Sequence, residues 1–225
     1  MICNQIYITG IKDAERVFQE DIYSFKKKYK EKYIFWDNEK IHDLLLTDNE
    51  HKKAYELVNP YAYKADLAKY LILHKFGGLV VDPGVFLIEE FTIKESALFL
   101  FCPPEFINNE AINNAFIYSI ENNFIIEKII EKTCFNILNK YYGNTPWDVT
   151  GPKLVYDCVM EQDLKNFKFG DTVDNDEYEP DRLYKFTIDN KTIALSKNIK
   201  TYNYRDKTEK TDYQLAWYSH KLYVD

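Results

Sequence analysis

Two aspartates, Asp66 and Asp82, stand within a helix–Gly-Gly–strand unit that we predict over residues 60–82. A carboxylate can hold a ribose hydroxyl. Its oxygens also suit a hard divalent cation, Mg²⁺ or Mn²⁺, that bridges a diphosphate. Two carboxylates at the two ends of one such unit indicate a polar ligand between them.

Asp66 lies inside the predicted helix, among residues that are apolar almost all round. An isolated carboxylate is costly to bury unless it is paired. Lys69 at i+3 and Tyr70 at i+4 could pair with it locally. The apolar neighbours Ala65 and Leu67 argue against a surface position, so a bound polar ligand is the alternative partner.

Asp82 follows the apolar run Leu79–Val81, which is typical of a strand covered by helices on both faces. Pro83 and Gly84 predict a turn directly after it. Ligands of open α/β sheets bind at the carboxyl ends of strands, so the Asp82 carboxylate is expected to face such a crevice. The alternative is that Asp82 only caps the turn.

The helix that carries Asp66 is predicted over residues 60–76. Asn59 is expected to cap its free N–H groups, and Pro60 fits the first turn, where a missing donor costs nothing. Gly77 and Gly78 are expected to end it, because glycine tolerates the positive φ of a C-terminal cap.

The rest of the chain alternates between strand-like and helix-like segments. We predict strands at residues 5–8, 33–36 and 97–101, helices at 13–29, 39–46, 50–58, 112–119 and 125–139, and a hairpin over 186–195. This order predicts one α/β domain over residues 1–225, with a central, mostly parallel sheet flanked by helices.

Composition narrows the class of protein. The net charge of −7 argues against nucleic acid as a partner. Aromatic residues reach 16%, as in sugar-binding walls but also in ordinary cores. The four cysteines show no regular spacing, which predicts buried thiols in a reducing compartment, and no segment resembles a membrane span or signal peptide. We therefore expect a cytoplasmic protein.

The segment YKADLAKYLILHKFGGLVVDPGV resembles the core of the sugar-binding DXD glycosyltransferases of family 32, whose pattern is roughly S-D-x-x-R-Y-x-x-L-x-x-x-G-G-x-Y-x-D-x-D. Shorter stretches agree in order: NQIYITG, YIFWDNEKIHDLL, NNAFIYS, which the resemblance makes a helix, and TGP. The resemblance implies a GT-A-like fold and the transfer of a sugar from a nucleotide-diphosphate-sugar donor to a glycan or glycoprotein acceptor, with retention of configuration.

Position by position, the resemblance implies roles in donor binding. Tyr7 would stack on the nucleobase, and Asp66 would bind sugar hydroxyls. Lys69 replaces an arginine that reaches the sugar or diphosphate, keeping the charge but losing the bidentate fork. Asp82 is the first Asp of the D-x-D motif, and Asn114 would contact the transferred sugar. The resemblance thus implies Asp66, Lys69 and Asp82 as the catalytic set.

Two departures concern the metal. The second Asp of the D-x-D motif is Gly84 here. Near the C-terminus the family has an H-x-W-like motif, where Trp217 fits a donor-binding role but the expected His aligns with Ala216. This leaves His220 as a displaced ligand beside Asp82. The resemblance therefore implies Mn²⁺ or Mg²⁺ held weakly. A second hypothesis is a degenerate fold that binds a nucleotide sugar or a protein without catalysis.

Overall fold

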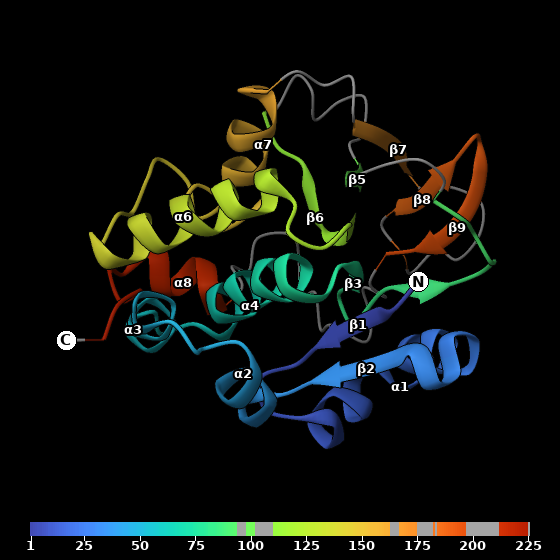
Figure 1. Cartoon of the computed structure of the whole chain (residues 1–225), viewed down its shortest axis with the longest axis horizontal. Coiled ribbons are helices and arrows are strands. Elements are labelled where there is room, and N and C mark those ends of the chain that lie inside the picture. Colours follow the sequence, from blue (N-terminus) through green and yellow to red (C-terminus); the bar gives the residue numbers. More distant parts are fainter. Residues whose placement is uncertain are drawn as a thin grey trace.

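The structure is a computed structural model that describes residues 1–93, 98–101, 110–162, 167–174, 182, 184–196 and 212–224. Within these ranges, nine strands follow one another in the order β2-β1-β3-β6-β5-β7-β8-β9-β4 (Figure 1). Helices pack against both faces of the central strands. The predicted Ala97 start of a strand and the thiol of Cys102 lie outside these ranges.

The parallel part of the sheet consists of five strands that run in the same direction. Its members are β2 (Tyr33–Trp36), β1 (Cys3–Ile6), β3 (Gly78–Val81), β5 (Leu98–Phe101) and β7 (Phe167–Asp174). β1 pairs in parallel with both β2 and β3, and β5 pairs in parallel with β7. One strand, β6 (Asn113–Ser119), runs antiparallel between β3 and β5. The expectation of a mostly parallel central sheet flanked by helices is confirmed.

A smaller antiparallel extension follows β7. It consists of β8 (Tyr184–Ile188), β9 (Lys191–Leu195) and β4 (Phe86–Leu87). The predicted hairpin is present, and its turn residues Asp189 and Asn190 have φ of 51° and 62°. Two successive left-handed residues match the twist of the flanking strands, which makes this a favoured two-residue turn.

Successive residues of each central strand belong alternately to two different hydrophobic clusters. Val80 of β3, Leu100 of β5 and Ile117 of β6 belong to the larger cluster, which includes the helices on one face. Their neighbours Val81, Phe101 and Phe116 belong to a second cluster on the other face. Because successive side chains of a strand point to opposite faces, a strand covered on both sides must be apolar throughout.

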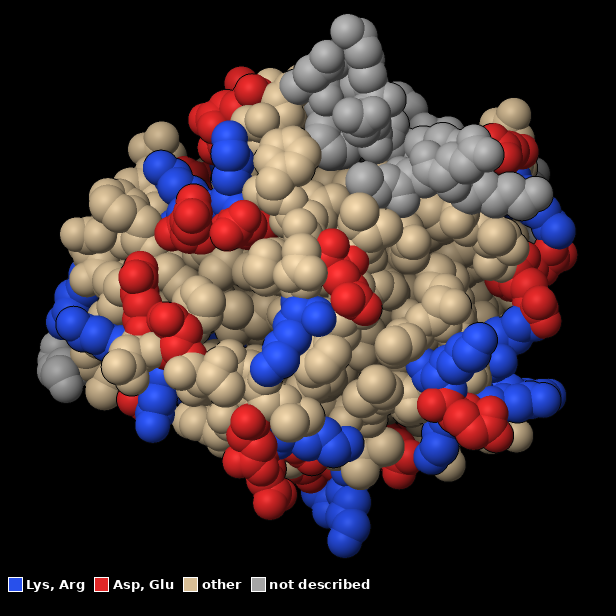
Figure 2. Space-filling model, in the orientation of Figure 1, with Lys and Arg blue, Asp and Glu red and all other residues tan. Residues whose placement is uncertain are grey.

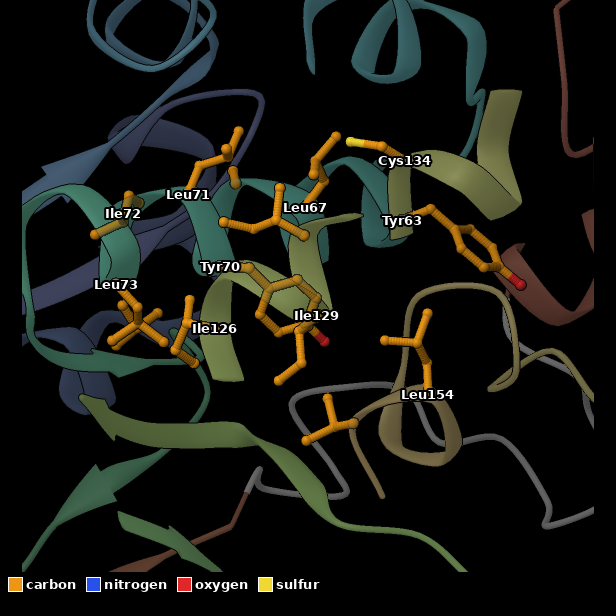
Figure 3. Packing of buried hydrophobic residues seen from close by; sticks show 14 of the residues in the cluster. Tyr63, Leu67, Tyr70, Leu71, Ile72, Leu73, Ile126, Ile129, Cys134 and Leu154 are labelled. Atoms are coloured by element: carbon orange, nitrogen blue, oxygen red, sulfur yellow. The ribbon is translucent and has the colours of Figure 1, made fainter. Parts of the chain in front are cut away.

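The larger cluster is organised by α4 (Tyr61–Phe76), α6 (Phe124–Leu138) and α7 (Pro152–Met160). Figure 3 shows Leu67, Tyr70 and Leu71 of α4 together with Ile126 and Ile129 of α6 among its side chains. The same side of the molecule carries α3 (Asn49–Leu57) and α8 (Asp212–Tyr218), while α2 (Asn38–Leu44) follows β2. The opposite face is covered by α1 (Ile11–Tyr29), whose C-terminus continues into the short 3₁₀ turn Lys30–Lys32.

Two predictions about local structure are wrong. Residues 112–119 were expected to be helical, and residues 113–119 form β6. The segment is short, and its buried apolar run Ala115–Ile117 lacks the alternation that separates strand from helix, so only the pairing with β3 and β5 decides that it is a strand. Asn59 does not cap α4: Pro60 is the N-cap residue, no side chain caps this end, and the helix starts at Tyr61.

The C-terminal end of α4 agrees with the prediction. Gly77 is the C-cap with φ 58°, and Gly78 follows with φ 87° as the first residue of β3. A Cβ atom on Gly78 would lie 2.6 Å from the carbonyl oxygen of Ile2. This close approach of two backbones lets β3 lie directly beside β1.

The surface in Figure 2 carries acidic and basic side chains interspersed with other residues. Cys3, Cys134 and Cys158 are buried free thiols, as expected for those three. Within the described ranges, no helix is long and apolar enough to cross a membrane.

Candidate functional site

A cavity of about 720 Å³ opens at the carboxyl ends of β1 and β3. Tyr7 and Thr9 from the loop after β1, and Asp82 and Pro83 from the turn after β3, form one side. The other walls come from α4, from the start of β6, from residues 146–152 and from α8. The cavity therefore lies where open α/β sheets bind ligands.

Asp66, Lys69 and Asp82 meet in this cavity. The Lys69 ammonium lies 3.1 Å from Asp66 Oδ1 and 2.7 Å from Asp82 Oδ1. The side chain of Lys69 is 7% exposed, and those of Asp66 and Asp82 are 16% and 17% exposed. One buried ammonium thus bridges two carboxylates whose other sides reach the cavity, as the turn at Pro83–Gly84 was expected to allow for Asp82.

Asp66 also accepts hydrogen bonds from residues far away in the chain. Asn114 Nδ2 donates to its Oδ1 at 3.0 Å, and Thr150 Oγ1 donates to its Oδ2 at 2.8 Å. The hydroxyl of Tyr70 donates to the Thr150 carbonyl at 2.7 Å and accepts from Asn114 Nδ2 at 3.2 Å. Asp66 is therefore held by protein groups on both oxygens, and Asn114 belongs to strand β6 instead of the predicted helix.

Burial raises the pKa of Asp66, and the charge of Asp82 adds to that rise, while Lys69 and the Thr150 hydroxyl oppose it. For Lys69, burial alone would lower the pKa, but the charges of Asp82 and Asp66 outweigh it and raise the pKa. Lys69 is thus held as an ammonium. With both carboxylates ionised, these three groups carry a net charge of −1.

Of the other predicted site residues, Tyr7 lies in the wall of the cavity, and Trp217 and His220 lie away from it. Tyr7 lines the cavity, and its ring meets Phe18 edge-on at 5.9 Å between ring centroids. Trp217 and His220 are not among the residues that line it. Trp217 Nε1 donates to the Tyr142 carbonyl at 2.6 Å, and the exposed His220 ring packs against Tyr142 at 4.7 Å. These two residues contact the loop after α6 instead of the cavity.

The position at which the resemblance expects a metal-binding His is Ala216, and Ala216 does line the cavity. In the part of the chain that the structure describes, no three His, Cys, Asp or Glu side chains form a metal site. Asp82 is paired with Lys69, and Gly84 offers no carboxylate. The described residues therefore do not by themselves fit a divalent cation.

Sequence reasoning missed several residues of the cavity. Thr150 belongs to the TGP stretch, which is uninformative alone, and its contact with Asp66 spans 84 positions in sequence. Tyr61, Trp147 and Tyr213 line the cavity as well. The aromatic content of the chain was the one available signal for them, and it did not indicate which aromatic rings lie in the core.

Residues 15–99 match the family model described as the glycosyltransferase sugar-binding region containing a DXD motif. This segment contains Asp66, Lys69 and Asp82. An uncharacterized glycosyltransferase of Acanthamoeba polyphaga mimivirus, L373, is 36% identical over 86 residues, which cover 36% of this chain and 34% of that protein. The match therefore spans about a third of the length of this relative.

A solved structure, the PaToxG glycosyltransferase, superposes with a TM-score of 0.53 over 71% of this chain and 67% of its own, at 16% identity. This similarity supports the GT-A-like fold expected from the sequence. The segment that matches the family model contributes both paired carboxylates, Asp66 and Asp82, to the cavity. Residues 15–99 thus resemble a glycosyltransferase sugar-binding region containing a DXD motif, within a fold that is similar to that of a solved glycosyltransferase.

Proposed function

We propose that this protein is a glycosyltransferase that moves a sugar from a nucleotide-diphosphate-sugar donor to an acceptor hydroxyl. The observation that carries the proposal is the Asp66–Lys69–Asp82 cluster, which lies in a cavity at the ends of β1 and β3. All three residues belong to the segment that matches the sugar-binding family.

Each wall of the cavity has a role in this proposal. Tyr7, in the loop after β1, would stack on the nucleobase. Asp82, at the end of β3, would bind the ribose or the diphosphate side of the donor. Asp66 and Asn114, which are hydrogen-bonded to each other at 3.0 Å, would bind hydroxyls of the transferred sugar. Lys69 would orient both carboxylates and offset their charge beside the leaving diphosphate.

The proposed reaction requires little direct chemical participation from any single side chain. The bond between the anomeric carbon and the diphosphate breaks, a bond to the acceptor oxygen forms, and the acceptor proton leaves to a diphosphate oxygen. Charge stabilisation at the diphosphate and orientation of the acceptor lower the barrier. The resemblance to family 32 favours retention of configuration.

We expect Mn²⁺ or Mg²⁺ to bind appreciably only together with the nucleoside diphosphate. With both carboxylates ionised, the three central groups carry a net charge of −1, and a diphosphate adds further negative charge, so electrostatics favours a cation that enters with the donor. Asp82 would be its protein ligand, and phosphate oxygens and water the others. Calorimetry of Mn²⁺ with and without UDP and GDP tests this, and tight binding to the protein alone contradicts it.

A thermal-shift screen against UDP-, GDP- and CDP-sugars tests donor binding, because a ligand of the folded state raises its stability by mass action. One donor class should stand out. The same shift should be lost in Asp82→Asn and kept in Asp157→Asn, which changes a half-exposed carboxylate on α7 that pairs with Lys153. Absence of any donor-dependent shift would overturn the proposal.

The second candidate is a catalytically inactive nucleotide-sugar or protein-binding module. Gly84 and Ala216 favour it, because both stand where the resemblance expects metal ligands. Hydrolysis of the selected donor, measured with and without Mn²⁺, separates the two candidates. A donor that binds but is neither hydrolysed nor transferred favours the inactive module.

A further inference from the structure

Three aromatic side chains, Tyr61, Trp147 and Tyr213, line the part of the cavity formed by the start of α4, the loop after α6 and α8. We call this group the aromatic rim. Tyr61 is 59% exposed and Trp147 is 42% exposed. Large aromatic residues that stay exposed beside a cavity contribute little to the core and are typical of binding surfaces.

The rim is held in place by contacts among its own members and their neighbours. Trp147 Nε1 donates to the Tyr213 hydroxyl at 3.3 Å, and the Tyr213 ring meets the buried Tyr63 edge-on at 6.1 Å between centroids. The Tyr63 hydroxyl donates to the Pro146 carbonyl at 2.9 Å. The indole is therefore tied to both α4 and α8.

The loop that carries Trp147 is tied down by hydrogen bonds at both ends. Asp148 Oδ2 accepts from the backbone N–H of Asn144 at 2.7 Å. Asn136 Nδ2 of α6 donates to the carbonyls of Asp148 and Val149 at 3.2 and 3.1 Å. A surface that is ordered before its ligand arrives loses less entropy on binding, so the rim is preorganised.

Two segments connect the rim to Asp66. Thr150, which follows the Trp147 loop, donates to Asp66 Oδ2 at 2.8 Å. Tyr63 precedes Asp66 by about one turn of α4. The rim is built on elements other than the ends of β1 and β3, where we propose that the donor nucleotide binds. The Asp66 carboxylate thus lies between a donor side and an aromatic side.

We propose that the aromatic rim is the acceptor site and that it binds a pyranose ring of a glycan, stacked on Trp147. This inference rests on the proposed transferase function. A pyranose has a face of C–H groups, which suits the electron-rich face of an indole, and an edge of hydroxyls, which suits the Asp66–Thr150 side. An aliphatic protein side chain would contact the rings but would offer no hydroxyl to the Asp66–Thr150 side.

The test is saturation-transfer NMR with three probes, methyl α-D-mannopyranoside, methyl β-D-glucopyranoside and methyl β-D-galactopyranoside. At least one should show saturation of ring C–H protons in the unmodified protein. Trp147→Ala should weaken that probe about tenfold, as expected for a central aromatic contact, whereas Trp147→Phe should keep most of the binding. Phe135→Ala is the matched control, since Phe135 is 59% exposed on α6 and does not line the cavity.

Donor binding is measured on the same variants by the thermal shift with the nucleotide sugar selected above. Trp147→Ala should leave that shift unchanged while it lowers the rate of sugar transfer. Loss of the donor shift in Trp147→Ala would mean that the rim binds the nucleobase, and absence of binding by all three glycosides would also overturn the inference. Failure of the transferase proposal itself would show instead as no donor shift in the unmodified protein.

Discussion

Asp66 accepts hydrogen bonds from Lys69, Asn114 and Thr150, so removing its carboxylate affects stability as well as sugar binding. Asp66→Ala leaves the Asn114 amide and the Thr150 hydroxyl without this partner. We expect it to lower the free energy of unfolding by about 1–3 kcal/mol and to abolish transfer. Asp66→Asn, which keeps the shape of the side chain, should cost less stability and still abolish transfer. Urea unfolding and transfer assays measure both, and full activity of the Asn variant would contradict the role of the charge.

The raised pKa of Asp66 predicts a pH dependence of stability. The folded state binds a proton at this carboxyl more tightly than the unfolded state, whose pKa is about 3.9. The stability that Asp66 contributes is therefore fully present below that value and falls as the pH rises through the folded pKa. The free energy of unfolding of the unmodified protein minus that of Asp66→Asn should decrease as the pH rises from about 4. An increasing difference would contradict the sign.

Tyr70 is a positioning residue, since its hydroxyl links Thr150 and Asn114 beneath Asp66. Tyr70→Phe should lower stability by about 1 kcal/mol and reduce the rate of transfer more than the affinity for donor. Tyr55→Phe is the control, because the equally buried Tyr55 donates its hydroxyl hydrogen to Asn38 at 3.0 Å and does not line the cavity. Equal activity of the two variants would mean that Tyr70 is structural only.

At the scale of elements, the placement of Asp82 depends on the contact between β1 and the start of β3. Gly78→Ala would place a Cβ 2.6 Å from the Ile2 carbonyl oxygen at φ 87°, so the backbone of β1 or β3 must move. Gly10 is a matched control, because its φ is 99° and a Cβ added there would meet no atom within 4 Å. Gly10→Ala should cost about 1–2 kcal/mol for the positive φ alone. Gly78→Ala should cost clearly more by urea unfolding, and equal losses would contradict the steric argument.

At the scale of the whole molecule, a buried ion pair joins α1 to a residue 161 positions further along the chain. Arg182 donates from Nη2 to Asp21 Oδ1 at 2.7 Å and from Nη1 to the Ser196 carbonyl at 2.8 Å, and the two charged side chains are 5% and 6% exposed. Arg182→Met leaves a buried carboxylate without this cation and should cost about 3–5 kcal/mol, measured by urea unfolding. The double change with Asp21→Leu should recover much of that loss. An additive loss in the double variant would show that the two residues do not act as a pair.

Residue patterns within short segments of the sequence predicted most of the helices and strands and one side of the cavity. Apolar runs, Gly77–Gly78 and the Asp82-Pro83-Gly84 turn depend on residues close together in sequence, so they predict α4, β3 and an aspartate at a strand end. The i+3 spacing on the predicted helix already put Lys69 beside Asp66, and the resemblance added an expected role for Lys69 in donor binding. The single-domain organisation stays a prediction.

Tertiary structure alone decided the rest of the site. Residues 113–119 form a strand because β3 and β5 supply its partners on either side. Thr150 reaches Asp66, and Trp147 reaches Tyr213, across 84 and 66 positions of the chain. Ala216 of α8 lines the cavity, whereas His220 lies beyond the end of α8 and packs against Tyr142. Such contacts depend on how the helices pack around the sheet, and periodicity, turns and charge patterns within a segment carry no information about the segment that will lie opposite.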